Sequence, residues 1–142
     1  AGAPLSAEQD AARMVDTAGL DEAAAALAWV CAVLRRDLPS SDGLRDALAS
    51  GVALCECINA VCPGMISRLN RADKPWGHME NIGAYTTACR RLGVTPVFET
   101  PDLYEAKNLK TVAQNVVALA RTARSLGYTG PLLAAQTATV SL

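Results

Sequence analysis

Cysteine side chains are the groups in this sequence whose types and spacing could bind a metal ion. Cys55, Cys57 and Cys62 lie within eight residues of one another. Zinc sites commonly use cysteine pairs separated by two to four residues, with further ligands elsewhere, and the single histidine, His78, is not suitably spaced. In a helix, moreover, these three cysteines do not all point to one side. We therefore expect no metal ion and no cofactor, and interpret all five cysteines as reduced, buried apolar side chains.

A cysteine paired with a histidine would be the other reactive arrangement. A nucleophilic cysteine needs an exposed and activated thiolate, but Cys89 falls on the apolar face of a predicted helix, eleven residues from His78. Neighbours on one helix face are three or four positions apart. The sequence also lacks a glycine-rich phosphate loop, a G-x-S-x-G elbow and a signature of paired carboxylates. We therefore expect a protein that is not an enzyme.

Charge is nearly balanced over the whole chain but uneven along it. The 142 residues include 13 Lys and Arg against 14 Asp and Glu, with a net charge of −1 and a pI of about 5.8. Proteins that bind nucleic acid or anionic membranes through bulk charge are basic, so we expect neither partner. Residues 106–126, however, carry four cations and no acid. This segment indicates either an ordinary solvated helix face or a basic docking patch for an acidic protein surface.

The elements that position these residues are predicted to be helices. Hydrophobic residues make up 51% of the chain but aromatic residues only 4%, a composition that favours helices packed through Ala, Leu and Val. Apolar side chains recur every three or four residues in four segments, at about 22–36, 52–62, 78–92 and 108–126. We expect the first three to cover the apolar stripe of the last, which consists of Leu109, Val112, Val116, Leu119, Ala123 and Leu126.

Local signals predict where the domain and its last helices begin and end. Thr100 and Pro101 suit the start of a short helix, and Gly127 suits the end of the last long one. Residues 6–18 have the pattern of a short, weak helix within an N-terminal extension, 1–19. The domain proper is predicted to span residues 20–131, followed by a mobile tail at 132–142 that has no periodicity.

An ordered set of motifs connects these segments to a known family. The chain contains L-A-W-V-C-A-V-L at 27–34, G-V-x-L-C-x-x-I-N at 51–59, M-E-N-I at 79–82 and D-L-Y-E-x-K-N-L at 102–109. In this order and at these spacings, the sequence resembles a calponin homology domain of the single-domain class found in calponin and transgelin. The resemblance covers about residues 20–131. It implies an all-α bundle of four main helices with short connecting helices and a nearly buried last helix.

Ten side chains are expected to anchor the core of such a bundle. Trp29 would be the core tryptophan of the first helix, and Trp76 would pin the loop before the third. The resemblance also implies that Leu103 and Tyr104 seat a short helix onto the last one. The expected anchors are Trp29, Leu54, Ile58, Trp76, Ile82, Leu103, Tyr104, Val112, Val116 and Leu119.

The resemblance also implies a function. Calponin homology domains are linked to the actin cytoskeleton, so we expect a non-catalytic, cytoplasmic, monomeric module that docks on an actin filament or an actin-associated protein. Two alternatives stay open. One is a signalling adaptor or autoinhibitory module that binds a helical partner, for which residues 6–18 are a candidate. The other is a domain that binds tubulin in microtubules through a basic face. The expected partner contacts are Glu22, Arg35, Arg36, Lys107, Lys110, Arg121 and Arg124.

Overall fold

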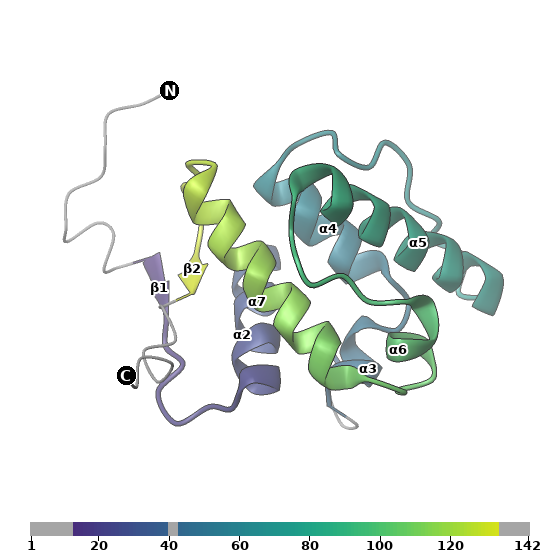
Figure 1. The fold of residues 1–142 in the computed structure, drawn as a ribbon, viewed down its shortest axis with the longest axis horizontal. Coiled ribbons are helices and arrows are strands. Elements are labelled where there is room, and N and C mark those ends of the chain that lie inside the picture. The colour runs from purple at the N-terminus through teal and green to yellow at the C-terminus, as the bar shows by residue number, and fades with distance from the viewer. Residues whose placement is uncertain (1–12, 40–42, 134–142) are drawn as a thin grey trace.

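Helices make up most of the chain that the computed structural model describes, which is residues 13–39 and 43–133 (Figure 1). The two strands in this part are two residues long each, so the prediction of an all-α domain is confirmed. In chain order the elements are β1 (Met14–Val15), α2 (Glu22–Leu34), α3 (Leu44–Leu48), α4 (Val52–Val61), α5 (Pro75–Leu92), α6 (Thr100–Tyr104), α7 (Leu109–Ser125) and β2 (Leu132–Leu133).

Helix α7 lies across the middle of the molecule, with α2, α3 and α6 packed against it (Figure 1). Its apolar stripe faces these neighbours, and Val112, Val116 and Leu119 are completely buried. Helix α4 packs against both α2 and α5. The core is therefore built from contacts among α2, α4, α5 and α7, as the periodicity indicates.

The ends of α7 are set by local hydrogen bonds. Asn108 begins the helix, because its side-chain oxygen accepts a hydrogen bond from the N–H of Thr111 at 3.3 Å. The helix ends at Ser125, so that Leu126 lies beyond the last full turn. We expected Leu126 to continue the apolar stripe; it is instead 53% exposed.

Trp29 connects α2 to the chain that follows α7. Its side chain is completely buried, and its indole Nε1 donates a hydrogen bond to the carbonyl oxygen of Pro131 at 3.0 Å. A buried indole needs such an acceptor. The buried anchors Leu54, Ile58, Ile82 and Leu103 surround the same core.

A close backbone contact joins α4 to α5. Gly51 has a φ of +75°, and a side chain there would meet the Cβ of Asn81 at 2.5 Å. The Asn81 amide donates to the carbonyl oxygens of Ser50, at 3.0 Å, and Asn70, at 2.7 Å. Its oxygen accepts from the N–H of Asn70 at 2.8 Å. One buried amide thus fixes the turn before α4 and the loop before α5.

The expected role of Trp76 in the core is wrong, since its side chain is 60% exposed. Helix α5 begins at Pro75, not at about residue 78, so that Trp76 belongs to the first helical turn. A helix turns by about 100° per residue, which places Trp76 on the side opposite Tyr85, a buried residue nine positions later. Tyr104, another expected anchor, is only partly buried.

The N-terminal and C-terminal segments differ from their predicted forms. Met14 and Val15 form a strand where a helix is predicted, and they pair in parallel with Leu132 and Leu133. Because Leu132 and Leu133 are buried, the tail predicted to begin at residue 132 instead starts with packed residues. Residues 6–12 of the predicted helix and residues 134–142 of the predicted tail lie outside the described residues.

Helix α6 begins one residue earlier than predicted. The capping residue is Glu99, not Thr100, and the carboxylate of Asp102 accepts a hydrogen bond from the N–H of Glu99 at 2.9 Å. Pro101 stands in the first turn as expected, where it has no N–H to leave unpaired.

Candidate functional site

Three of the five thiols are held in the core. Cys55, Cys57 and Cys89 are buried and form no disulfide, whereas Cys31 and Cys62, which we also expected to be buried, are only partly so. Burial, with a smaller effect of the Glu56 carboxylate, raises the pKa of Cys55 to about 12, and burial also raises the pKa of Cys57 and Cys89. A protonated, enclosed thiol is neither a nucleophile nor a metal ligand. The described residues contain no group of three or more metal-ligating side chains.

His78 has a structural setting instead of a cysteine partner. Its Nε2 lies 2.8 Å from a carboxylate oxygen of Asp73, and its Nδ1 lies 3.1 Å from the hydroxyl of Tyr104. The Tyr104 carbonyl accepts hydrogen bonds from Arg45, whose guanidinium also lies 5.1 Å from the centre of the tyrosine ring. The cluster joins the start of α5 to α3 and α6.

A buried amide also holds the loop before α6. The Tyr85 hydroxyl donates to the side-chain oxygen of Asn115 at 2.7 Å, and the Asn115 amide donates to the carbonyl of Pro96 at 2.8 Å. Burial raises the pKa of Tyr85 well above its usual value. These groups satisfy each other inside the core, which is a structural arrangement.

Four of the predicted contact residues lie at one end of the molecule, where α2 and α7 both terminate. Arg35 follows α2 in a left-handed conformation, φ 57°, and so ends the helix at Leu34, two residues earlier than predicted. It lines a surface hollow of about 440 Å³ together with Arg13 and Met14. The guanidinium of Arg124 lies 3.7 Å from the sulfur of Met14. Strand β1 thus brings the ends of the two helices together, and we call Arg35, Arg36, Arg121 and Arg124 the basic end.

The four arginines of the basic end differ in whether they form an ion pair. Arg36 forms an ion pair with Glu56, which also pairs with Arg71 at 3.1 Å. Both arginines lower the pKa of Glu56 against the opposing effect of its burial. Arg35, Arg121 and Arg124 are exposed and form no ion pair with the described residues. They are therefore the members available to an external partner.

The other three predicted contacts lie near the amino ends of the same helices. Glu22 begins α2 and Lys110 stands in the first turn of α7. Lys107 precedes α7 and pairs with Glu105 at 3.5 Å. The structure therefore divides the seven predicted residues into two groups, and it does not form one patch from them.

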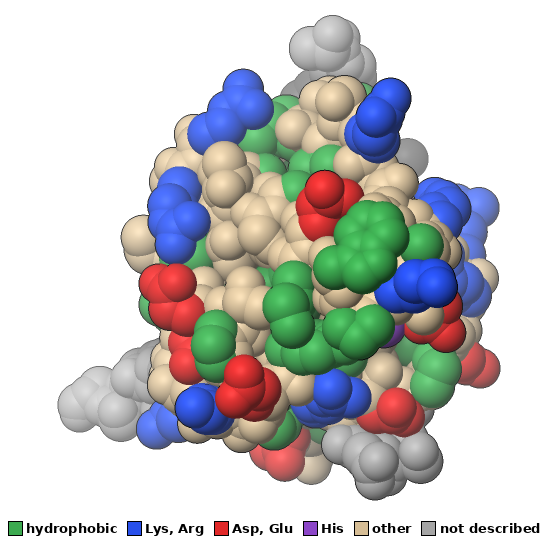
Figure 2. Space-filling model, turned by 90° about the vertical axis from the view of Figure 1, so that its right-hand side faces the viewer, with side chains coloured by type: hydrophobic (Ala, Val, Ile, Leu, Met, Phe, Trp, Pro, Cys, Tyr) green, Lys and Arg blue, Asp and Glu red, His purple; other side chains and the backbone are tan. Residues whose placement is uncertain are grey.

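Sequence reasoning missed an exposed apolar group at the start of α5. Trp76 is 60% and Met79 43% exposed, and hydrophobic side chains gather on the face that carries this end of α5 (Figure 2). Exposed tryptophans are unusual on a protein surface that has no binding role. The signal was present in the sequence: with Pro75 taken as the first helical residue, the helical repeat turns Trp76 away from the core.

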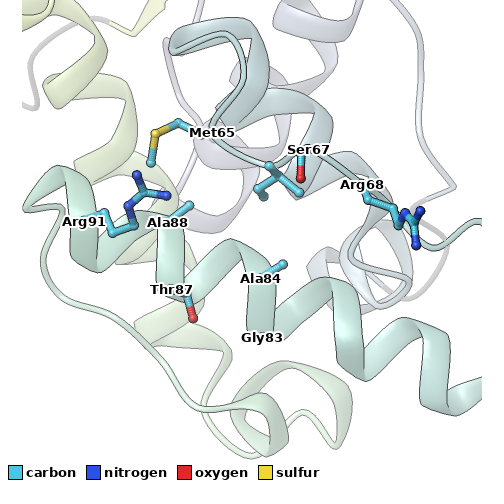
Figure 3. Close-up of a pocket in the computed structure, with 9 residues that line it drawn as sticks. Met65, Ser67, Arg68, Gly83, Ala84, Thr87, Ala88 and Arg91 are labelled. Atoms are coloured by element: carbon cyan, nitrogen blue, oxygen red, sulfur yellow. The ribbon is translucent and has the colours of Figure 1, made fainter.

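A groove adjoins this apolar group. It has a volume of about 350 Å³ and runs between α5 and the loop at 65–68. Figure 3 shows Ala84 and Ala88 directed toward this loop from α5, with Met65 above them. Arg68 and Arg91 stand at its opposite ends (Figure 3). The groove has small side chains along one wall and a cation at each end.

Together these surfaces define a class of protein: a helical domain in which three of the five thiols are buried and whose surface carries basic and apolar contact sites. The chain belongs to the calponin homology (CH) domain family, because the sequence model of that family matches residues 20–125. It is thus a cytoskeleton-related module, and the resemblance seen in the sequence is confirmed.

Relatives of known identity agree with this family. The chain is 36% identical over 123 residues to myophilin of Echinococcus granulosus and 32% identical over 108 residues to muscle-specific protein 20 of Drosophila melanogaster. It is 36% identical over 111 residues to Rac guanine nucleotide exchange factor B of Dictyostelium discoideum. These matches cover 84%, 74% and 76% of this chain but 65%, 59% and 9% of the relatives. The chain therefore spans less than two thirds of each relative's length.

A solved structure has the same fold. The calponin-homology domain of Rng2 from Schizosaccharomyces pombe matches with a TM-score of 0.67, over 81% of this chain and 74% of that one. The sequence identity is 24%, so this likeness concerns the fold. Within the described residues, no helix is both long and apolar enough to cross a membrane.

Proposed function

We propose that this chain is a non-catalytic docking module that binds an actin filament, or a protein associated with one, as a monomer in the cytoplasm. Family membership over residues 20–125 supports a cytoskeletal role. The observation that carries the proposal is the basic end, where Arg35, Arg121 and Arg124 are exposed together. Glu22, Lys107 and Lys110 lie at the opposite ends of their helices and are left out of the proposed contact.

Electrostatics is the physical basis of this contact. Actin presents an acidic surface. Three guanidinium groups that form no ion pair within the described part of the chain lie on one end of a nearly neutral domain, and they orient the domain toward actin. Exposed charges separated by more than about 8 Å are screened at physiological ionic strength. Binding through the basic end should therefore weaken as salt is added.

Sedimentation with filamentous actin tests the proposal. The domain should pellet with filaments at low salt and less so at about 0.15 M salt. The double variant Arg35→Glu with Arg124→Glu should lose most of this pelleting. A matched control, Lys107→Glu with Lys110→Glu, makes the same change in charge at the other end of α7 and should pellet like the original chain. No pelleting of the original chain at any salt would refute direct binding to actin.

A signalling adaptor is a second candidate, and one relative favours it. The match to Rac guanine nucleotide exchange factor B covers only 9% of that protein, so a domain of this kind occurs there within a much larger chain. In addition, Arg13 donates hydrogen bonds to the carbonyls of Tyr128 and Gly130, which attaches the N-terminal segment to the domain. Such a segment suits autoinhibition by displacement.

Two measurements separate the candidates. Removal of residues 1–18 should lower the amide-exchange protection of Leu132 and Leu133, which pair with β1; unchanged protection and unchanged ligand binding would contradict autoinhibition by this segment. Pelleting with microtubules, but not with actin filaments, would instead favour the tubulin-binding alternative and overturn the actin proposal.

A further inference from the structure

Gly83 is a residue whose presence the fold itself does not explain. It lies in the interior of α5, where glycine is less favourable than alanine because it loses more conformational freedom on folding. A Cβ built at Gly83 meets no atom within 4 Å. Gly77, in the same helix, differs: a Cβ there would meet the carbonyl oxygen of Ala72 at 3.0 Å. Packing within the domain requires Gly77 but not Gly83.

Gly83 lines the groove and lies on the side of α5 that carries the exposed apolar group. Trp76 is seven residues before it, two helical turns, and so shares its side of α5. Met79 and Thr87 stand one turn away on either side and are also exposed. Ala84 faces the groove (Figure 3). An external backbone could therefore approach α5 most closely at Gly83, with a tryptophan beside it.

Two positively charged side chains lie at opposite ends of this face. Arg91 is eight residues beyond Gly83, about 12 Å along the helix, and Arg68 closes the other end of the groove (Figure 3). Both are exposed, and neither pairs with an acid among the residues that the structure describes. The acid on this face, Glu80, accepts a hydrogen bond from Asn70 at 2.9 Å.

We propose that this face of α5 binds an acidic amphipathic helix of a partner protein. Apolar side chains of the partner would contact Trp76 and Met79, its backbone would cross α5 at Gly83, and its carboxylates would meet Arg68 and Arg91. Small residues at a helix crossing allow the close approach that such packing needs. The face from Trp76 to Arg91 is about 22 Å long, which suits a helix of about 15 residues. This inference is independent of the actin contact, which uses the basic end.

The test uses a defined probe. A fluorescein-labelled, alanine-based helix of about 18 residues carries leucines along one side and glutamates near both ends; a second probe has lysine in place of each glutamate. The acidic probe should bind the full chain saturably with a Kd below about 0.1 mM in fluorescence anisotropy, and the basic probe should not. In NMR spectra of the domain, the backbone amide chemical shifts that change on binding should belong mainly to residues 65–68 and 76–91.

Three variants locate the site. The double variant Arg68→Glu with Arg91→Glu, the variant Trp76→Ala, and the variant Gly83→Leu should each weaken binding at least about tenfold. Gly83→Leu is the sharpest of these, because its added side chain meets open space in the free domain and fills the crossing point. Thermal unfolding checks that the variant remains folded. Lys107→Glu with Lys110→Glu, which changes residues outside α5 and outside the lining of the groove, should bind the acidic probe like the original chain.

Several results would overturn the inference. One is an acidic probe that does not saturate the domain below about 1 mM, or that binds no better than the basic probe. Equal binding by a folded Gly83→Leu variant would show that no partner crosses at this glycine. Amide shifts confined to the basic end would assign the probe to that surface.

Discussion

Two glycines of this domain are present for opposite physical reasons, which makes them a matched pair. Gly51 has a left-handed φ and a neighbouring backbone within 3 Å of any added Cβ. Gly51→Ala should therefore cost at least about 2 kcal/mol through backbone strain and overpacking. Gly83→Ala should instead stabilise the domain by about 0.5–1 kcal/mol. Alanine is a better helix former than glycine, and its methyl group would meet no other atom within 4 Å.

Urea unfolding of both variants checks this prediction, with the free energy of unfolding extrapolated to water. A destabilised Gly83→Ala variant would show that Gly83 has a packing role inside the domain. That result would also remove the reason for assigning the glycine to a partner.

The buried thiols give the domain a dependence on alkaline pH. Burial raises the pKa of Cys55 from 9.0 to about 12 and raises those of Cys57 and Cys89 as well. In the unfolded chain these thiols ionise near pH 9, while in the folded domain they stay protonated. The unfolded state thus binds fewer protons between pH 9 and 12, and stability, fully present below pH 9, falls as the pH rises through this range.

Unfolding measured at about pH 8 and about pH 10 checks the direction of this change. Substitution of Cys55 by alanine should reduce the difference between the two values. At about pH 8, a thiol reagent should modify the partly exposed Cys31 and Cys62 before the three buried cysteines. Rapid modification of Cys55 in the folded domain would contradict its burial.

At the scale of the elements, the two tryptophans separate what holds the bundle together from what faces outward. Trp29 extends from α2 into the core and donates a hydrogen bond to the carbonyl oxygen of Pro131, whereas Trp76 projects from the first turn of α5. Trp29→Ala should cost about 3–5 kcal/mol. Trp76→Ala should change the free energy of unfolding by about 0.5 kcal/mol or less, as a surface substitution does. Equal losses from both would refute the assignment of Trp76 to the surface.

The same elements show how far a sequence can be interpreted. The apolar repeat placed α7 correctly, since a long amphipathic helix buries its stripe wherever it packs. The start of α5 was misplaced because the polar residues around Pro75 have no apolar repeat, and this error alone turned Trp76 toward the core. The pairing of Met14 with Leu132 had no local signal, because two-residue strands are fixed by contacts between distant parts of the chain.

The candidate site was less predictable than the fold. The sequence identified the cations at 106–126 but not which of them share one end, since that depends on how α2 and α7 pack. Strand β1 decides the grouping, because it connects the hollow lined by Arg35 with the contact made by Arg124. The groove is formed by a loop and a helix, so it appears only once both are folded.

At the scale of the whole molecule, the two proposed contacts lie apart. The basic end is where α2 and α7 terminate, while the start of α5 projects from the other side of the molecule (Figure 1). Two sites on separate surfaces can be occupied at once, and a rigid domain between them then acts as an adaptor. Competition arises only if the ligands overlap or if one changes the conformation needed by the other.

Simultaneous binding is therefore the expected outcome when actin filaments and the acidic helical probe are both present. The fraction of the domain that pellets with filaments should stay the same at saturating probe, and the labelled probe should enter the pellet with it. The Gly83→Leu variant should pellet without carrying the probe, and the Arg35→Glu with Arg124→Glu variant should leave both in solution. Displacement of the domain from filaments by the probe would show that the two ligands share a surface, because independent sites leave each affinity unchanged.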